Sequence, residues 1–226
     1  MGEQTGDADR FSKLFYPFLH EEEQVPAETA LAEVRHSTLE KSREVAELRQ
    51  QVCETSADAL VCAATAMATA FRNGKKLLAF GNGGSATDAQ SLSVDFVHPP
   101  LAGRRTLPAM ALTDDSAVVT ALANDVGFEN VFARQIIAFG KPGDVAMGLS
   151  TSGNSRNLLV AFETAKQLGL VTVGLAGYDG GKMAQAETVD YCCVVPSSSV
   201  HRIQEAQGTV FHTLWDLVHR LLAACA

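Results

Sequence analysis

Residues 77–98, LLAFGNGGSATDAQSLSVDFVH, contain the pattern that decides the fold. An apolar run is followed by a glycine-rich turn and then by a segment of helical character. A short, continuous apolar run is typical of a strand that is buried on both faces of a sheet. Glycines let the backbone approach an anion closely, and the free N–H groups at a helix start favour negative charge. The stretch therefore predicts a strand–turn–helix unit that suits phosphate binding.

Four more apolar runs follow, each bounded by Gly, Pro, Asp or Ser. They cover residues 107–113, 144–151, 171–177 and 190–196. Segments of helical character separate or follow them, at residues 88–97, 116–124, 128–139, 155–168, 182–186 and 203–224. Strands that alternate with helices predict an α/β fold, a parallel sheet covered by helices on both faces in a flavodoxin-like or Rossmann-like arrangement. Ligands of such sheets bind beyond the carboxyl ends of the strands.

The part of the chain before the first strand has a different character. Residues 37–74 carry apolar side chains near helical spacing, which predicts a long helix or a helix pair that stops at Gly74. Residues 1–36 are mixed in composition and contain a small aromatic cluster at 11–20. We therefore expect an N-terminal helical extension or arm over 1–36 and a single α/β domain over 37–226.

Composition and charge exclude several classes of function. The 226 residues carry a net charge of −8 with no basic run, so nucleic acid is not an expected partner. No apolar stretch approaches the ~20 residues that span a bilayer, so no membrane association is expected. The polar N-terminus does not resemble a signal peptide. The five cysteines fit no metal-binding spacing, so we expect reduced thiols in a soluble, cytoplasmic protein.

A second donor-rich turn, STSGNS at residues 150–155, follows the apolar run at 144–151. It offers the hydroxyls of Ser150, Thr151, Ser152 and Ser155, as the first turn offers that of Ser85. Several neutral donors around one point hold a phosphate well. Neither turn has the dinucleotide or Walker spacing, so we expect a small phosphorylated ligand and no nucleotide cofactor. The alternative is that both are ordinary strand-to-helix turns with capping serines.

Roughly residues 40–222 resemble the sugar isomerase (SIS) domain family, and within it the sedoheptulose 7-phosphate (phosphoheptose) isomerases. The motifs that carry the resemblance occur in the family's order: GNGGSATDAQ (81–90), TALANDVGFENVFARQI (120–136), GDVAMGLSTSGNSRNLLVAF (143–162), GYDGGKMA (177–184) and RIQEAQGTVFH (202–212). The resemblance implies a five-stranded parallel sheet and a homotetramer with its sites at subunit interfaces. It places Trp215 in the core of that tetramer.

The resemblance also assigns substrate-binding residues for a phosphorylated sugar. It implies that the phosphate is held by Ser85, Ser150, Thr151, Ser152 and Ser155. Asn82, Gly83 and Asp114 would line the sugar chain, together with Gln204. Asp114 lies in LTDDSA, where a turn or helix-capping role is an equal alternative.

Ketose–aldose isomerisation moves a proton between adjacent carbons and needs an acid and a base. The family presents a His and, four residues on, a Glu after the first loop, and later a Gln and a His eight residues apart. Here Ser91 and Asp95 occupy the first two positions, while Gln204 and His212 are retained. The resemblance therefore implies that Asp95 and His212 are the catalytic pair, on opposite sides of the sugar. The alternative for His212 is a packed, inert helix histidine.

In the family the four positions also bind zinc. A neutral serine hydroxyl is a poor zinc ligand, so a site made of Asp95, Gln204 and His212 is expected to be weak or absent. His98 is three residues beyond Asp95 and offers a rearranged site with Asp95, Gln204 and His212. Pro99 argues against that site, because it disfavours helical geometry at the preceding residue.

The leading hypothesis is a sugar-phosphate isomerase of the phosphoheptose type. Two rivals stay open at this point. One is a non-catalytic SIS protein that binds a replication initiator protein, and the other is a sugar-phosphate sensor that acts on another protein. Loss of the family's His at Ser91 suits the first rival, whereas retention of a carboxylate at Asp95 and of His212 argues against it.

Overall fold

The computed structural model describes Leu14 and residues 27–224, and the predicted aromatic cluster at 11–20 lies almost wholly outside these residues. The chain divides into two units, residues 1–43 and 44–226. The first long helix, α2 (Ala27–Arg72), begins ten residues before the predicted helix and runs through the predicted boundary at residue 36. The division into an arm and a domain therefore stays a prediction.

The sheet confirms the prediction of five parallel strands. Its strands, in chain order, are β1 (Leu77–Gly81), β2 (Ala109–Ala111), β3 (Val145–Ser150), β4 (Val171–Gly177) and β5 (Tyr191–Val195). Their order across the sheet is β2-β1-β3-β4-β5, and every neighbouring pair is parallel. Because β1 and β3 are neighbours, the two predicted phosphate loops leave the same edge of the sheet side by side.

Helices occupy the segments that the sequence predicted, with shifted ends. They are α3 (Gly84–Val97), α4 (Ser116–Val126), α5 (Val131–Phe139), α6 (Arg156–Gln167), α7 (Gly181–Gln185) and α8 (Val200–Ala224). The segment predicted as one helix at 128–139 begins with a separate 3-10 turn, η2 (Phe128–Asn130). Asn130 interrupts the helix there, and its side-chain amide donates to the carbonyl of Val126 at 2.7 Å.

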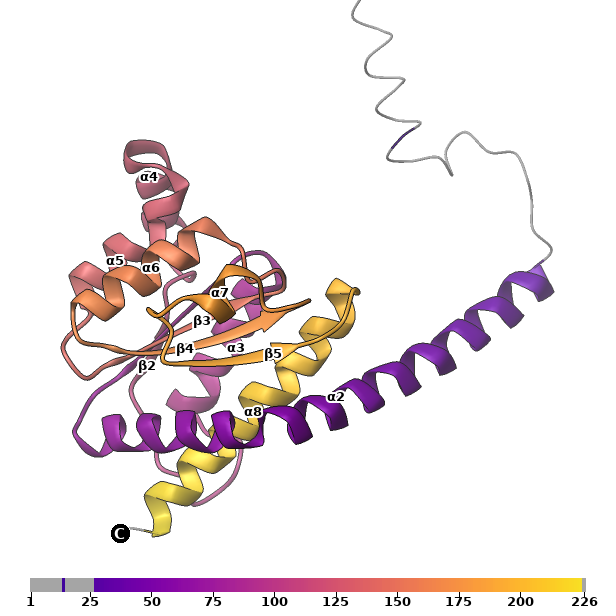
Figure 1. The fold of residues 1–226 in the computed structure, drawn as a ribbon, viewed down its shortest axis with the longest axis horizontal. Coiled ribbons are helices and arrows are strands. Elements are labelled where there is room, and N and C mark those ends of the chain that lie inside the picture. Colours follow the sequence, from indigo (N-terminus) through magenta and orange to yellow (C-terminus); the bar gives the residue numbers. More distant parts are fainter. Residues whose placement is uncertain (1–13, 15–26, 225–226) are drawn as a thin grey trace, which may run out of the picture. The chain divides into compact units, whose positions relative to one another are not determined.

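Helices cover both faces of the sheet, as Figure 1 shows. On one face, α3, α8 and the part of α2 beyond residue 47 form a core with side chains such as Met67, Phe96 and Trp215. On the other face, α5, α6 and α7 form a second core around Phe80 and Phe162. The predicted three-layer α/β fold is therefore confirmed. No helix within residues 27–224 is long and apolar enough to cross a bilayer.

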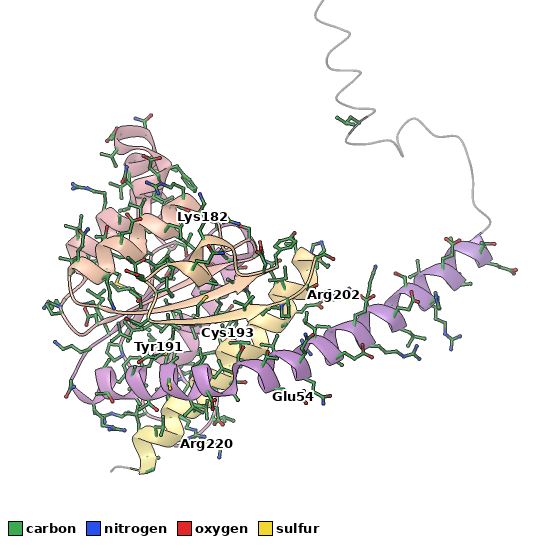
Figure 2. All side chains as sticks on the ribbon, in the orientation of Figure 1. Glu54, Lys182, Tyr191, Cys193, Arg202 and Arg220 are labelled. Carbon is green, nitrogen blue, oxygen red and sulfur yellow. The ribbon has the colours of Figure 1, made fainter. Side chains whose placement is uncertain are left out.

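The adjacent cysteines of β5 point to opposite faces, as neighbours in a strand must. Cys193, labelled in Figure 2, belongs to the core under α2 and α8, whereas Cys192 packs against the core under α6. Burial raises the pKa of Cys192 to about 12, and burial likewise raises the pKa of Cys193. Both are free thiols and, being held protonated, they are unreactive.

The centre of the sheet sets a strict size limit at Gly148 on β3. A Cβ atom there would lie 2.6 Å from the Phe162 ring and 2.8 Å from the Phe80 ring. These two rings pack on each other with centroids 5.3 Å apart, so neither has room to withdraw. We predict that Gly148→Ala lowers the free energy of unfolding by about 1–3 kcal/mol, the usual cost of overpacking a core.

Gly208→Ala is the matched control, because it makes the same chemical change in helix α8. The nearest atom to a Cβ at Gly208 is 4.0 Å away, and helix propensity favours alanine by about 1 kcal/mol. Urea unfolding of both variants checks the prediction. Equal midpoints for Gly148→Ala and the wild type would contradict the packing argument.

Candidate active site

The first loop joins β1 to α3, and two adjacent glycines give it its shape. Gly83 has φ 56° and ψ −123°, a conformation that a side chain would strain. Gly84 lies close to α8: a Cβ there would lie 1.9 Å from the amide nitrogen of Gln204, so a larger residue would displace the Gln204 side chain. The side chain of Gln204 on α8 therefore lies against the first loop, as the sequence predicted for a residue of the site.

The second loop, residues 150–155, is ordered by its own hydroxyls. Ser150 Oγ accepts from Gly153 N at 3.1 Å and lies 3.2 Å from Ser155 Oγ. Ser152 Oγ accepts from Asn154 N at 3.2 Å. Ser150 is buried, while Thr151, Ser152 and Ser155 are half-buried. The hydroxyls predicted to hold a phosphate therefore lie on one short turn, three of them partly open to solvent.

A reciprocal pair of amides joins the two loops. Asn82 Nδ2 donates to Asn157 Oδ1, and Asn157 Nδ2 donates to Asn82 Oδ1, both at 2.9 Å. Asn157 lies in the first turn of α6 and is buried. Asn82, predicted to line the sugar chain, thus holds the first loop against the helix that follows the second. Nothing local in the sequence identifies Asn157 as its partner.

The alternative that these are ordinary turns with capping serines does not fit. Neither α3 nor α6 has a side-chain hydrogen bond at its N-cap, although Ser155 occupies the N-cap position of α6. Ser85 lies inside the first turn of α3 and is buried. Both helices therefore begin with backbone N–H groups that no capping side chain occupies. Such groups, with the helix dipole, attract an anion.

Asp95 and His212 meet across the contact between α3 and α8. Nε2 of His212 lies 3.4 Å from Oδ2 of Asp95. The His212 side chain is 61% exposed and that of Asp95 is 21% exposed, so the interpretation of His212 as a packed, inert residue does not hold. Their closeness differs from the predicted placement on opposite sides of a sugar, because atoms 3.4 Å apart leave no room for a carbon chain.

Two residues near this pair were missed by the sequence analysis. Burial raises the pKa of Asp88, while the nearby His212 acts in the opposite direction, and Asp88 Oδ2 is buried without a hydrogen-bond partner among the described residues. Gln207 is fully buried on α8 and donates through Nε2 to the carbonyl of Ser150 at 3.2 Å. Gln207 therefore ties α8 to the second loop. Helical spacing was the available signal: Asp88 is seven residues before Asp95, on the same helix face.

Asp114 and His98 lie away from this pair. Both line a cavity of about 520 Å³ between α3 and β2, with Val94, Val97 and Met110 among its other walls. The capping role considered for Asp114 belongs to its neighbour, because Asp115 Oδ1 accepts from Val118 N at 3.0 Å at the start of α4. Ser152 instead borders a cavity of about 740 Å³, which extends past Tyr178 and Asp179.

The side chains present do not make a complete zinc site. Asp95 and His212 are two suitable ligands, and Gln204 adds only an amide. Within residues 27–224 no three His, Cys, Asp or Glu side chains are grouped so that they could hold a metal ion. The rearranged site with His98 is therefore not assembled, because His98 follows the end of α3 and lines the cavity beside β2. Ser91 is exposed on α3.

Comparison with known protein families shows which family has this fold and these loops. A family model described as "SIS domain" matches residues 42–177. The phosphoheptose isomerase of Aquifex aeolicus is 45% identical over 180 residues, which cover 80% of this chain and 93% of that protein. The phosphoheptose isomerase of Geotalea daltonii is 50% identical over 156 residues, covering 69% of this chain and 80% of that protein.

Solved structures agree with the sequence relatives. The phosphoheptose isomerase GmhA from Neisseria gonorrhoeae superposes with a TM-score of 0.76 at 35% identity, covering 82% of this chain and 98% of that chain. A phosphoheptose isomerase from Francisella tularensis gives 0.72 at 33% identity, covering 81% and 98%. With this fold, these loops and these relatives, the chain belongs to the SIS-domain family and, within it, to the phosphoheptose isomerases.

Proposed function

We propose that the protein interconverts sedoheptulose 7-phosphate and the corresponding aldoheptose 7-phosphate. The observation that carries the proposal is the contact between Asp95 and His212, a carboxylate and an imidazole at 3.4 Å, on the helices that also meet at the first loop. A binding protein or a sensor has no need of an acid–base pair at this place. The curated relatives, which are phosphoheptose isomerases, favour the enzyme over both rivals.

The phosphate end of the substrate is assigned to the two loops. Ser85, Thr151, Ser152 and Ser155 would donate hydroxyl hydrogen bonds, and the first turns of α3 and α6 would add backbone N–H groups. Gln204 lies against the first loop, and His212 is eight residues further along α8, a rise of about 12 Å. A seven-carbon sugar in extended form, together with its phosphate ester, has a length comparable to that rise. We therefore expect a substrate anchored at the loops to reach the acid–base pair with its first carbons.

The isomerisation takes two steps, and each step comprises two proton transfers. The Asp95 carboxylate takes the proton from C1 of the ketose while the His212 imidazolium protonates O2, which gives a neutral 1,2-enediol. Asp95 then delivers its proton to C2, and His212 removes the proton of O1 as the aldehyde forms. Because the two groups are neighbours, both act from the same side of the two-carbon unit. No step is routed through zinc, because the donor set does not complete a zinc site.

The assembly proposed is a homotetramer in the cytoplasm. Large apolar side chains are exposed at the end of α3, at Val94, Val97 and Leu101, and around α5, at Phe128 and Ile137. Helix α4 carries apolar residues but buries none of them. Faces of this kind are typical of subunit contacts. The reduced state of the four described cysteines suits a reducing compartment.

For assembly, the expected result is a tetramer built from self-complementary contacts. Light scattering at micromolar concentration measures the mass of the assembly directly. The double variant Val94→Glu with Val97→Glu should have a lower mass than the wild type, because each glutamate would place a charge in the subunit contact. A monomeric wild type would contradict the proposal and would remove any site shared between subunits.

For phosphate recognition, we predict that Ser85→Ala combined with Ser152→Ala weakens sugar-phosphate binding by about a hundredfold or more. Each lost hydrogen bond to a charged group is worth ~1.5–3 kcal/mol. Calorimetric titration with sedoheptulose 7-phosphate provides the affinity. Ser42→Ala with Ser56→Ala, two hydroxyl losses on α2, is the control and should leave affinity unchanged. Equal affinity of the loop variant and the wild type would remove these loops as the phosphate site.

For catalysis, we predict that His212→Ala lowers turnover by about a hundredfold or more, the scale of a lost general acid or base. Asp95→Asn should do the same, since it keeps shape but loses the base. Binding should weaken less, because the loops hold the phosphate. Asp95→Glu tests the length of the side chain, and His36→Ala, an exposed histidine on α2, is the neutral control.

The assay is exchange of the substrate's C1 proton with deuterated water, followed by NMR, over a panel of C5 to C8 ketose phosphates with and without zinc. Wild-type protein that binds a sugar phosphate yet exchanges no proton with any of them would overturn the enzymatic function and favour the binding-protein rivals.

A further inference from the structure

The carbonyl of Asp95 lacks its normal helical partner. In an α-helix the C=O of each residue accepts from the N–H four residues later. For Asp95 that residue is Pro99, which has no N–H. Helix α3 ends at Val97, and its last backbone bond runs from His98 N to Val94 O at 2.7 Å. The sequence therefore leaves a free acceptor on the residue that carries the proposed base.

Trp215 on α8 supplies the missing hydrogen-bond donor to the Asp95 carbonyl. Its indole Nε1 donates to the carbonyl oxygen of Asp95 at 2.9 Å. Trp215 is only 6% exposed, and a buried indole N–H needs an acceptor. One hydrogen bond thus satisfies two groups that would otherwise be unpaired. This differs from the expectation that Trp215 packs in a tetramer core, because its ring is already buried within the single chain.

Asp95 is held twice by the same face of α8. Trp215 contacts its backbone, and His212, three residues earlier in α8, contacts its carboxylate at 3.4 Å. An aspartate has one methylene, so its carboxylate follows the backbone closely. A shift of the Asp95 carbonyl therefore moves the carboxylate with it, whereas a longer side chain would absorb part of the shift.

Trp215 is itself fixed by His219 one turn further along α8. The two rings lie 4.5 Å apart, and His219 Nδ1 is 2.9 Å from the carbonyl of Trp215. His219 Nε2 is 3.0 Å from the carbonyl of Arg105, in the segment between α3 and β2. The ring of His219 also stacks on Phe96, the neighbour of Asp95, with centroids 5.8 Å apart. The indole is therefore held in a packed cluster of rings with His219 and Phe96.

We propose that Trp215 is a positioning residue for the proton-transfer pair, and that Pro99 makes it one by freeing the Asp95 carbonyl. The inference rests on the proposed function, because positioning matters only if Asp95 moves a proton. Trp215 touches no substrate in this account. It acts through the backbone of Asp95 and sets the distance between the carboxylate and His212.

The test removes the hydrogen bond and then supplies another. Trp215→Phe keeps an aromatic ring but loses the N–H, and we expect kcat to fall about tenfold with KM nearly unchanged, since small misplacements of catalytic groups are costly. Adding Pro99→Ala supplies a backbone N–H four residues after Asp95. It reaches the Asp95 carbonyl once His98, which now has φ −131° and ψ 78°, takes up helical dihedrals and extends the last turn of α3. The double variant should recover most of the lost kcat, which a merely structural role of the indole would not produce.

Arg104→Met is the matched control. The guanidinium of Arg104 lies over the same indole, 5.9 Å from its centroid, and takes no part in the bond to Asp95. Arg104 is partly buried and also pairs with Asp216 at 2.9 Å. Its loss should leave kcat within about twofold, because a single cation–π contact and an ion pair near the surface are each weak. An unchanged kcat in Trp215→Phe, or a loss that Pro99→Ala fails to rescue, overturns the proposal.

An activity-independent measurement separates this proposal from the proposed function. Trp215 is the only tryptophan, so its indole N–H gives one NMR signal, which should exchange slowly with solvent and shift in Pro99→Ala. The His212 ring signals should move in Trp215→Phe in the same direction as in Asp95→Asn. If they do and the wild type isomerises nothing, the proposed function fails while the positioning contact stands. If they do not move, the positioning proposal fails.

Discussion

The packing of α3 against α8 is the contact on which the whole site depends. Gln204 lies against Gly84 at the first loop, and His212 meets Asp95 further along the same pair of helices. Helix α3 starts at the phosphate loop and carries Asp95 near its other end. The distance from the proposed phosphate site to the proposed acid–base pair is therefore set by one helix pair, and it changes only if that packing changes.

The sheet imposes a second constraint, because it brings two helix starts to one edge. Parallel neighbours β1 and β3 end together, so the turns that follow them cannot lie far apart. The amide pair of Asn82 and Asn157 then holds them at one spacing. With hydroxyls and N–H groups as donors, the proposed site would bind an anion without a basic cluster, which suits a chain of net charge −8.

Sequence periodicity was sufficient to predict the strands, but it could not predict which side chains pair with one another. All five apolar runs became strands, since a strand covered on both faces has few polar positions. Helix ends were less predictable: α2 begins ten residues early, and Asn130 divides the segment predicted as one helix. Partners such as Asn157 and Trp215 lie 75 and 120 residues from the groups that they bind, and no local pattern reports such a pairing.

The resemblance predicted the two groups that meet, Asp95 and His212, but not how they are held. Trp215 was expected to pack in the core of a tetramer, whereas its ring is already buried within the single chain. The sequence feature that could have indicated its contact with the Asp95 carbonyl is Pro99. A proline four residues after an acidic helix residue removes one backbone donor, and a free carbonyl in a buried place must find another.

That reasoning also gives a physical account of the aspartate at position 95. A glutamate reaches further and has one more rotatable bond, so its carboxylate tolerates an imprecise backbone. An aspartate reaches less far and depends on where its backbone is held. In this chain the shorter carboxylate occurs together with a proline that frees its carbonyl and an indole that binds it. The loss of side-chain reach is thus matched by a tighter hold on the backbone, and His212 comes within 3.4 Å of the carboxylate from the same helix face.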